Sequence, residues 1–438
     1  MEQTKKALRR VLVLGGYGLI GSGIMYALTA RGHRVTGLGR NAATAARVSP
    51  DANWMIRDLR DLQTPTDWTG VLDGFDVVVN AVGALQDGGA DDLVAVQEQA
   101  IVALASAAAA AGVDLIQISA AGVASDASTS FMATKARADA AIQASPGRWF
   151  IFRPGLVIAQ TSYGGTALVR MLAAMPVVQP VAMADAPVQS VGLSDVVDAV
   201  AMAVEGDLAP GLTCDLVEDH SRPLADVVAA HREWLGLGPA RPIAVPNWVL
   251  GPISWCADLL GHLGWRSPMR TTAVRVLAEG VRGDPTPWRN ATGQGCAALP
   301  GILAAIPATA EHRLAARMAL LLPVAISILA LFWLLSGLIG MISLEQAAAT
   351  LTAVGWPVGL AKASVLFWTV VDIALAAGVL VRRWAPRACW AMIAVSLFYL
   401  IAASVFTPGL WLDPLGPLVK VLPGIVLALV TRALLETR

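Results

Sequence analysis

Short apolar runs alternate with helical stretches through the first half of the chain. Val11 to Leu14 is wholly apolar, the pattern of a central parallel strand that is buried on both faces. Among the helical stretches is an alanine-rich one from about Asp91 to Ala111, which Gly112 ends. Five more apolar runs predict strands, in HRVTGLGR, NWMIRDLRD, FDVVVNAVG, DLIQISAAGV and RWFIFRPGLV. This alternation predicts an α/β domain with a doubly wound parallel sheet, which binds ligands at the strand carboxyl ends.

The pattern changes near Arg317. Residues 318–344 carry no charge, and 318–341 is long enough to cross about 30 Å of hydrocarbon. Three further apolar stretches follow, at about 363–381, 388–407 and 415–431. Pro423 weakens the last of them. We predict an all-α transmembrane four-helix bundle in residues 313–438, with three helices as the alternative.

A glycine-rich turn joins the first strand to the first helix. Gly15, Gly18 and Gly21 have G-x-x-G-x-x-G spacing, and a helical pattern closed by Gly32 follows. Such glycines let the backbone approach a pyrophosphate at the positive end of a helix. The alternative is a purely structural tight turn. We predict a dinucleotide site made by Gly15, Gly16, Tyr17, Gly18, Leu19, Ile20 and Gly21.

The end of the second predicted strand bears on which cofactor binds. An acid at this point bonds the ribose hydroxyls of NAD(H), whereas a basic residue accommodates the 2′-phosphate of NADP(H). The chain has Gly39-Arg40-Asn41 here and no acid. This favours NADP(H), with NAD(H) as the second choice. The plainer interpretation is that Arg40 is a solvated loop residue.

The order of these motifs resembles the short-chain dehydrogenase/reductases, above all their extended and atypical branches. The motifs are GGYGLIG, DL at 58–59, NAVG at 80–83, SAAG at 119–122, Lys135 and RPG at 153–155. The resemblance covers residues 8–205 well and 206–310 loosely. It implies a Rossmann domain in 1–205 and a smaller substrate or lid lobe, interleaved with it, in 206–312. The further cofactor contacts that it implies are Asp58 and Leu59 at the adenine, Ala81, Val82 and Gly83 along the nicotinamide ribose, Lys135 on the ribose hydroxyls, and Pro154.

The expected acid is missing. In that family a tyrosine four residues before the lysine donates the proton, and this position is Phe131. Ser119, Lys135 and, in a later loop, Tyr163 are the catalytic candidates, and Phe131, Arg153, Tyr163 and Asp372 are the candidates for contact with the substrate. Other hydroxyls nearby in sequence are Ser128, Thr129 and Ser130. Three interpretations stay open: another donor, an acceptor such as a quinone that takes protons from solvent, or NADPH bound without catalysis.

Composition narrows the classes of function. Only 15% of the 438 residues are charged, against about 25% in a typical soluble domain. The net charge of zero gives no electrostatic reason to expect nucleic-acid binding. The four cysteines and five histidines lack paired or ligand spacing, so we expect no disulfide framework and no metal. The first apolar run is too short for a signal peptide, which needs roughly 7–15 apolar residues.

Tryptophans and one acid mark the second half. Trp248, Trp255 and Trp265 lie among aliphatic residues, so this segment is expected either to touch a bilayer or to form ordinary core or lid. The four-helix unit resembles the DoxX-like membrane family in architecture, which implies a link to quinone-related redox chemistry. Asp372, the acid in the second apolar stretch, is expected to serve a proton path or a headgroup, or simply to bond a neighbouring helix.

Basic residues predict the orientation of the bundle. With four helices, one side holds Arg313, Arg317, Arg382, Arg383, Arg387, Arg432 and Arg438. The opposite loops, 345–356 and 408–413, have no Lys or Arg. We therefore expect a multi-pass protein of the inner (cytoplasmic) membrane, with its nucleotide domain and C-terminus in the cytoplasm.

Together these features predict a membrane-anchored NADP(H)-dependent oxidoreductase. Its substrate is expected to be a hydrophobic small molecule, such as a quinone or a lipid-like carbonyl, and its surroundings a lipid bilayer. The alternative is a non-catalytic NAD(P)H-binding sensor or assembly module. Association with further copies of the chain, or with a membrane partner, stays open.

Overall fold

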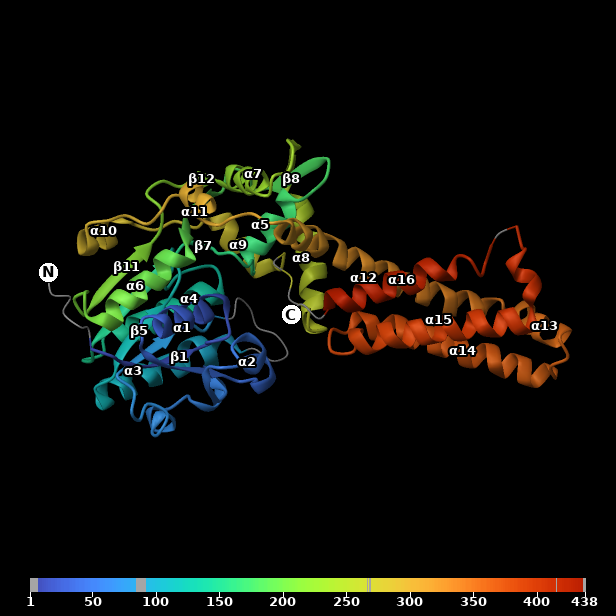
Figure 1. The fold of residues 1–438 in the computed structure, drawn as a ribbon, viewed down its shortest axis with the longest axis horizontal. Helices are drawn as coiled ribbons and strands as arrows, with labels where there is room; N and C mark the ends of the chain where they lie inside the picture. Colours follow the sequence, from blue (N-terminus) through green and yellow to red (C-terminus); the bar gives the residue numbers. More distant parts are fainter. Residues whose placement is uncertain (1–6, 84–91, 266, 268, 415, 436–438) are drawn as a thin grey trace. The chain divides into compact units, whose positions relative to one another are not determined.

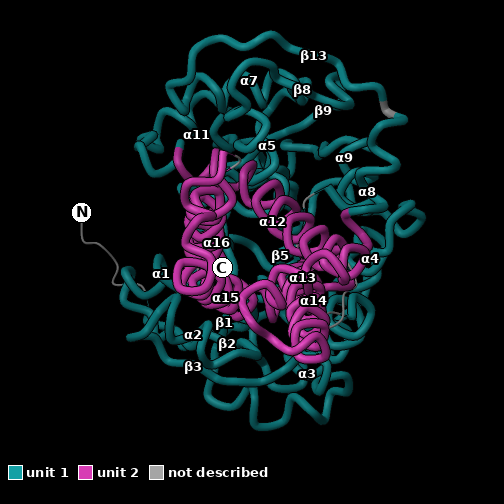
Figure 2. The backbone as a smooth tube through the Cα atoms, turned by 90° about the vertical axis from the view of Figure 1, so that its right-hand side faces the viewer, with its two compact units in different colours: residues 1–256, 267–313 teal, residues 257–266, 314–438 magenta. Residues whose placement is uncertain are grey.

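The computed structural model describes residues 7–83, 92–265, 267, 269–414 and 416–435. The predicted helix start at Asp91 and the predicted start of the last apolar stretch at Leu415 lie outside this part. The chain divides into two compact units, which Figure 2 colours separately. The first unit is residues 1–256 with 267–313, and the second is 257–266 with 314–438.

A seven-stranded parallel sheet forms the centre of the first unit (Figure 1). Its order is β11-β6-β5-β4-β1-β2-β3, so the direction of winding reverses between β1 and β4. This confirms the predicted doubly wound fold. The seventh strand, β11, comes from the segment assigned to the smaller lobe and was not predicted. The strands are β1 (Arg10–Leu14), β2 (Arg34–Gly39), β3 (Asn53–Ile56), β4 (Val77–Asn80), β5 (Asp114–Ile118), β6 (Trp149–Pro154) and β11 (Leu212–Leu216).

Helices cover both faces of this sheet (Figure 1). Val11 and Val13 of β1 share a core with α1 (Leu19–Ala30) and α6 (Leu193–Glu205). Leu12 and Leu14 share the opposite core with α3 and α4. A central strand with alternate residues in two cores must be apolar throughout, which is why its sequence shows no polar alternation. The bounds on that second face are α3 (Ala100–Ala111) and α4 (Ser130–Gln143).

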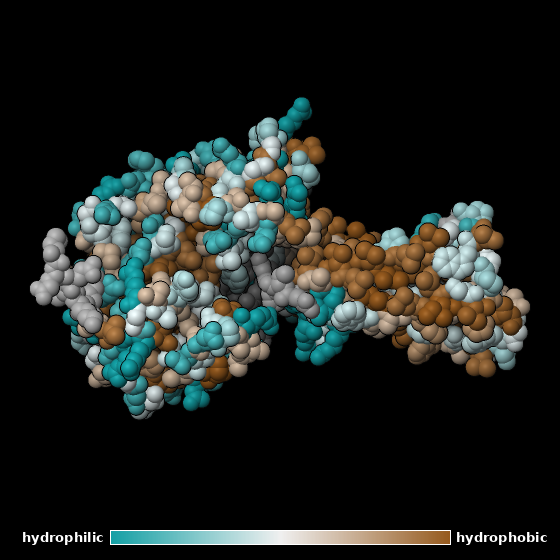
Figure 3. Space-filling view, in the orientation of Figure 1, coloured by the Kyte–Doolittle hydropathy of each residue, from teal (hydrophilic) through white to brown (hydrophobic). Residues whose placement is uncertain are grey.

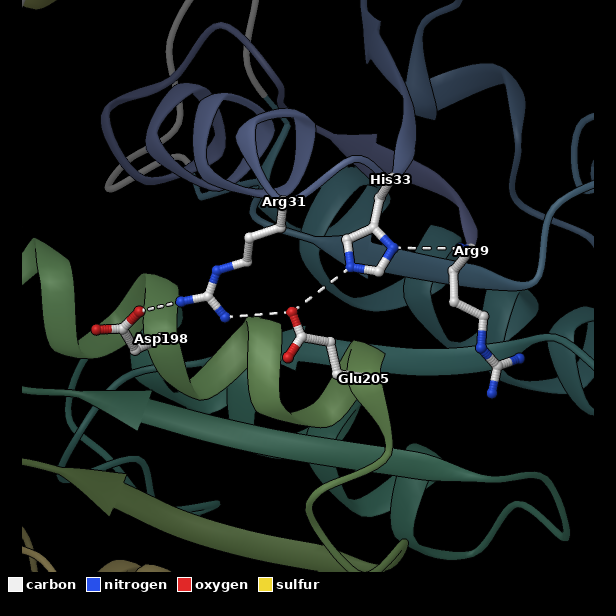
Figure 4. Close-up of polar contacts among 5 residues, drawn as sticks. All are labelled: Arg9, Arg31, His33, Asp198 and Glu205. Atoms are coloured by element: carbon white, nitrogen blue, oxygen red, sulfur yellow. Dashed lines mark hydrogen bonds and ion pairs between the residues drawn. The ribbon is translucent and has the colours of Figure 1, made fainter. Parts of the chain in front are cut away.

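One arginine ties α1 to α6 (Figure 4). Arg31 Nη2 donates to Asp198 Oδ1 at 2.6 Å, and Arg31 Nη1 donates to Glu205 Oε1 at 3.3 Å. His33 Nε2 lies 3.7 Å from the same Glu205 oxygen, while His33 Nδ1 accepts from the Arg9 N–H. Exposed ion pairs of this kind contribute only about 0–1 kcal/mol each. They set the alignment of the two helices, whereas the apolar core supplies the stability.

Smaller elements make up the rest of the first unit, and α8 continues into the second. Three two-stranded ladders pair β7 with β10, β9 with β12 and β8 with β13. The strands are β7 (Leu156–Ile158), β8 (Val178–Ala182), β9 (Pro187–Val188), β10 (Ser190–Gly192), β12 (Arg222–Pro223) and β13 (Arg241–Val245). The remaining helices are α2 (Ala42–Val48), α5 (Gly165–Ala173), α7 (Leu224–Trp234), α8 (Asn247–His262), α9 (Thr271–Glu279), α10 (Thr286–Thr292) and α11 (Leu299–Ala305).

The second unit is helical. Its main helices are α12 (Ala310–Ile342, which begins in the first unit), α13 (Leu344–Ala353), α14 (Val358–Leu380), α15 (Ala385–Phe406) and α16 (Val421–Leu434). Within the described residues, α12, α14 and α15 are long and apolar enough to cross a membrane. Brown apolar side chains cover much of their exposed surface in Figure 3.

The predicted fourth helix is present but short. Helix α16 has 14 residues, which is about 21 Å of helix against about 30 Å of hydrocarbon. Its far end returns to the end of α14, because the Leu435 carbonyl accepts from Arg382 Nη2 at 3.0 Å. Among the described residues the helical unit therefore has three helices of spanning length, which is the alternative count and not the predicted four.

Asp372 joins three helices of the bundle. Its carboxylate accepts from the hydroxyl of Ser336 on α12 at 2.7 Å and from that of Tyr399 on α15 at 3.2 Å. Close packing at Gly337 brings α12 against α14, since a Cβ there would lie 2.7 Å from Ile373 Cγ1 and 3.0 Å from the Thr369 carbonyl oxygen. Small residues permit such contacts between membrane helices. Of the roles considered for Asp372, these bonds favour linkage between helices.

Replacing Gly337 by alanine is expected to push α12 away from α14. We expect the bundle to lose about 1–3 kcal/mol of stability, the usual cost of overpacking. The thermal midpoint of the full chain in detergent measures this loss. Gly424→Ala on α16 is the control, because a Cβ there meets nothing within 4 Å. Equal midpoints for the two variants would contradict the packing described.

Candidate cofactor and catalytic site

The glycine turn after β1 has no room for side chains at two of its positions. Gly15 has φ +71°, a conformation that favours glycine, and a Cβ on Gly21 would lie 2.2 Å from the Gly15 carbonyl oxygen. The Gly18 N–H donates to that same oxygen at 2.8 Å. Glycine at positions 15 and 21 is therefore needed for the turn itself, whatever binds there.

Gly18 differs from the other two glycines. Its φ of −73° suits any residue, and a Cβ there would meet only the Gly15 carbonyl oxygen, at 3.2 Å. Gly18 is the N-cap of α1, where no side chain caps the helix and no acid lies in the first turn. The positive helix end thus meets open space that a larger residue at position 18 would fill. This fits a pyrophosphate better than it fits a purely structural turn.

Tyr17 fixes the end of β2 beside the turn. Its ring packs so close to Gly39 that a Cβ there would lie 2.2 Å from Tyr17 Cε1. The Tyr17 hydroxyl accepts from the Arg40 N–H at 3.3 Å, and its ring centroid lies 6.0 Å from that of Trp54. The Arg40 side chain is exposed at the carboxyl edge of the sheet, where a 2′-phosphate is expected.

Asp58 and Leu59 follow β3 with different roles. Asp58 caps the short helix Leu59–Asp61 and accepts from Arg60 Nη2 at 2.7 Å. Hydrogen bonding from Arg60 is the main reason that the pKa of Asp58 is lowered, and the charge of Arg40 contributes a little. The Leu59 side chain is core, packed with the α3 layer. The predicted adenine contact of the Leu59 side chain is therefore not supported by its position in the core.

The end of β4 lies directly against the glycine turn. A Cβ on Gly15 would be 3.0 Å from Val82 Cγ2 and 3.2 Å from the Ala81 carbonyl oxygen. The buried side chain of Asn80 accepts from the Val82 N–H at 3.1 Å and donates to Gln117 Oε1 at 2.8 Å. The glycine turn and the end of β4, which are both predicted to contact the cofactor, therefore lie against each other. Gly83, which follows Val82, is exposed.

A buried carboxylate connects a predicted catalytic residue, Ser119, with a predicted substrate-pocket residue, Arg153. Asp139 on α4 is 1% exposed, and its Oδ2 accepts from Ser119 Oγ at 2.8 Å and from Arg153 Nε at 2.9 Å. Burial raises the pKa of Asp139, and the charge of Arg153 chiefly opposes this. The network joins the ends of β5 and β6, next to buried Pro154. Asp139 was not among the predicted site residues, although its i+4 spacing after Lys135 places both side chains on one face of α4.

Lys135 is buried in the same region. Its Nζ donates to the Ile118 carbonyl at 3.1 Å and lies 5.8 Å from the centroid of the Phe131 ring. Burial lowers the pKa of Lys135 from 10.5 to about 8, although the charge of Asp139 partly opposes this. The side chain is thus one helical turn from the position where the family has its tyrosine, as the resemblance implies.

The other predicted hydroxyls have different partners. Ser128 Oγ donates to Glu279, and Thr129 Oγ1 accepts from the Met132 N–H at the start of α4. Tyr163 is about half exposed, and its main chain forms a turn with Thr166. Ser119, by contrast, donates to Asp139 and so belongs to the buried network.

Gly18→Val is expected to abolish cofactor binding, because the side chain enters the space in front of α1. In the wild type, NADPH should raise the thermal midpoint of the full chain, and in the variant it should not. Gly301→Val is the matched control, since a Cβ there meets nothing within 4 Å. If NADPH raises the thermal midpoint of Gly18→Val as much as that of the wild type, the pyrophosphate does not bind at this turn.

The depressed pKa of Lys135 predicts a pH dependence of stability. Between pH 8 and 10.5 the native state has released this proton while the unfolded state still holds it. Stability of the wild type should therefore rise through this window relative to Lys135→Met, by up to about 3 kcal/mol. Denaturant unfolding across the window measures the difference, which should stay constant below it. If the stability difference between the wild type and Lys135→Met does not change with pH, the pKa of Lys135 is not lowered by burial.

Solved structures show the same fold in other proteins. The Bordetella bronchiseptica enzyme WbmG, solved with NAD, matches with a TM-score of 0.52 and 17% identity over 69% of this chain and 94% of its own. WbmH from the same organism, solved with NAD+, matches with a TM-score of 0.51 and 17% identity over 68% and 97%. The protein gox2253 matches with a TM-score of 0.50 and 20% identity over 70% and 99%. A search of curated proteins finds no match.

Two family models match separate parts of the chain. The model described as NAD(P)H-binding matches residues 15–204, which hold the glycine turn and the Asp139 network. The model of the DoxX-like family matches residues 330–429, which hold most of the helical unit. The chain therefore combines an NAD(P)H-binding Rossmann domain with a C-terminal DoxX-like domain, and the described part of its C-terminal region has three helices of membrane-spanning length.

Proposed function

We propose that this protein is a membrane-bound NAD(P)H-dependent oxidoreductase that reduces an apolar acceptor, such as a quinone or a lipid-like carbonyl. The observation that carries this proposal is the buried network in which Asp139 holds Ser119 and Arg153 beside Lys135. The network holds a hydroxyl at the carboxyl end of a strand, which is where a doubly wound sheet binds its ligands. The DoxX-like domain in the same chain supports an acceptor that dissolves in the bilayer.

The residues that would hold the cofactor lie at the strand carboxyl ends. The turn from Gly15 to Gly21 and the start of α1 suit the pyrophosphate, and Lys135 suits a ribose hydroxyl. Two of the fold relatives were solved with NAD, yet exposed Arg40 supports a preference for NADP(H) in this chain. When bound, the reduced cofactor supplies a hydride, so the acceptor needs one further proton.

Ser119 is the proposed source of that proton. The Ser119 Oγ–H would pass to the acceptor oxygen, and Ser119 Oγ would take a proton in turn from protonated Asp139, whose Oδ2 lies 2.8 Å away. The raised pKa of Asp139 favours this return path, because the carboxyl then binds a proton more readily. Phe131 contributes an apolar ring where the family has a polar one. This suits an apolar acceptor, which needs less acid assistance if it is a quinone.

Charge distribution supports the proposed orientation in an inner membrane. The Arg382–Leu435 bond places the α14–α15 loop and the end of α16 at one end of the bundle. This end carries Arg382 and Arg383 in the loop, Arg387 at the start of α15 and Arg432 near the end of α16. The opposite end has Lys420 and Lys362, and Lys362 is paired with Glu345 at 2.6 Å. Both lysines lie outside the loops 345–356 and 408–413 from which the orientation was predicted. The arginines still outnumber them, so we place the arginine-rich end, the nucleotide domain and the C-terminus in the cytoplasm.

A non-catalytic sensor is the second candidate. Its supporting observation is Phe131, which removes the family's proton donor while Lys135 stays buried nearby. A sensor would bind NADPH tightly and respond to it without oxidising it. The two candidates share the cofactor site and differ in turnover alone.

Turnover by the wild type separates the two candidates, and the Ser119→Ala variant tests the proposed proton donor. We expect the wild type in lipid nanodiscs to oxidise NADPH with at least one member of a panel of quinones and apolar aldehydes. Ser119→Ala should lower kcat about 10²–10⁴-fold, the usual value of a positioned proton donor, with little change in NADPH affinity. Ser106→Ala, an exposed serine on α3, should behave as wild type. NADPH binding without oxidation by any acceptor would favour the sensor, and absence of binding would end both proposals.

A further inference from the structure

Helix α8 has large apolar side chains on its exposed face. Trp248 is 77% exposed, Trp255 67% and Leu259 52%, and their i, i+7, i+11 spacing puts all three on one face. The buried face holds Leu250, Ser254 and Ala257. The exposed face of a helix in a soluble protein is normally polar, so this helix is apolar where water would be expected.

The end of α8 is fixed to the helical bundle. Residues 257–266 belong to the second unit, and there the Leu263 carbonyl accepts from the Arg382 N–H at 3.0 Å. Trp265 Nε1 donates to the carbonyl of Leu380, which is the last residue of α14. The Arg382 guanidinium lies 5.5 Å from the Trp265 ring centroid. The segment that follows α8 therefore sits at the terminus of a helix of membrane-spanning length.

That terminus has the composition of a membrane–water boundary. Arg382 and Arg383 follow α14 directly, and Arg383 lies 4.8 Å from the ring centroid of Trp384, which is 46% exposed. Tryptophan and arginine are enriched where membrane helices leave the hydrocarbon. The chain thus holds the last turn of α8 at the depth at which lipid headgroups begin.

We propose that α8 is an interfacial helix that lies on the bilayer surface, with Trp248, Trp255 and Leu259 among the upper acyl chains. The arginines after α14 complement anionic phospholipid headgroups at the same level. This contact does not depend on turnover or on a bound nucleotide. It identifies the lipid surface, rather than a protein, as what covers the exposed face of α8.

A thiol on α8 allows a direct test. Cys256 is exposed next to Trp255, whereas Cys214 and Cys389 are buried. Burial raises the pKa of both Cys214 and Cys296 to about 12, which makes these thiols slow to react. A fluorescent nitrobenzoxadiazole label on the full-length protein should therefore attach at Cys256, and Cys256→Ser should lose most of the label.

The labelled protein is placed in nanodiscs of phosphatidylcholine and phosphatidylglycerol, with nitroxide lipids quenching near the top of the acyl chains. The control label sits at Tyr26→Cys in the Cys256→Ser background, because Tyr26 is an exposed aromatic residue on α1. We expect lipid quenching at Cys256 to exceed that at the control several-fold. The double variant Trp248→Gln, Trp255→Gln should reduce it, and iodide in the water should quench Cys256 less than the control.

Two results would overturn the proposal. Quenching of Cys256 by iodide but not by nitroxide lipid would mean that the face is in water. Protection from both quenchers would mean that another protein surface covers α8, such as a second copy of the chain. In either case the NADPH response of the full chain is a separate measurement, so failure here leaves the proposed oxidoreductase function standing.

Discussion

The Asp139 carboxylate is the contact on which the site depends. It is almost fully buried, and it holds Ser119 of the β5 end and Arg153 of the β6 end to α4. Lys135 is buried one helical turn away. Removing one partner of a buried charge set is costly, because the remaining charges stay desolvated and uncompensated. The same carboxylate therefore fixes two strands and a helix relative to each other and orients the hydroxyl that we assign to proton transfer.

The two domains use carboxylates in parallel ways. Asp139 joins three elements of the Rossmann domain, and Asp372 joins α12, α14 and α15 in the bundle. In both places the acid is buried or half-buried and accepts hydrogen bonds, so its cost of burial is offset. Only the first of the two lies where the family resemblance places a reacting group. We therefore assign chemistry to Asp139 and helix linkage to Asp372.

Local patterns in the sequence were enough to predict the alternation of strands and helices, the glycine turn and the change to apolar helices. They failed where the answer depends on distant contacts. Strand β11, LTCDL, is short and half polar, and it becomes a strand by pairing with β6. Nothing local marks Asp139 as buried, because Arg153 and Ser119 reach it from other elements. The length of α16 was overestimated because hydropathy does not report where a helix begins after a proline-rich loop.

A single-turnover measurement with NADPH deuterated at the transferred position asks whether the protein transfers hydride from NADPH to an acceptor, with Ser119 as the proton donor. The full chain in nanodiscs is mixed with excess acceptor, and loss of the reduced nicotinamide is followed over time. The account predicts oxidation that is slower with the deuterated cofactor and much slower in Ser119→Ala, because hydride and proton move in the same step or in coupled steps. Oxidation no faster than that of free NADPH, with the cofactor demonstrably bound, would contradict it.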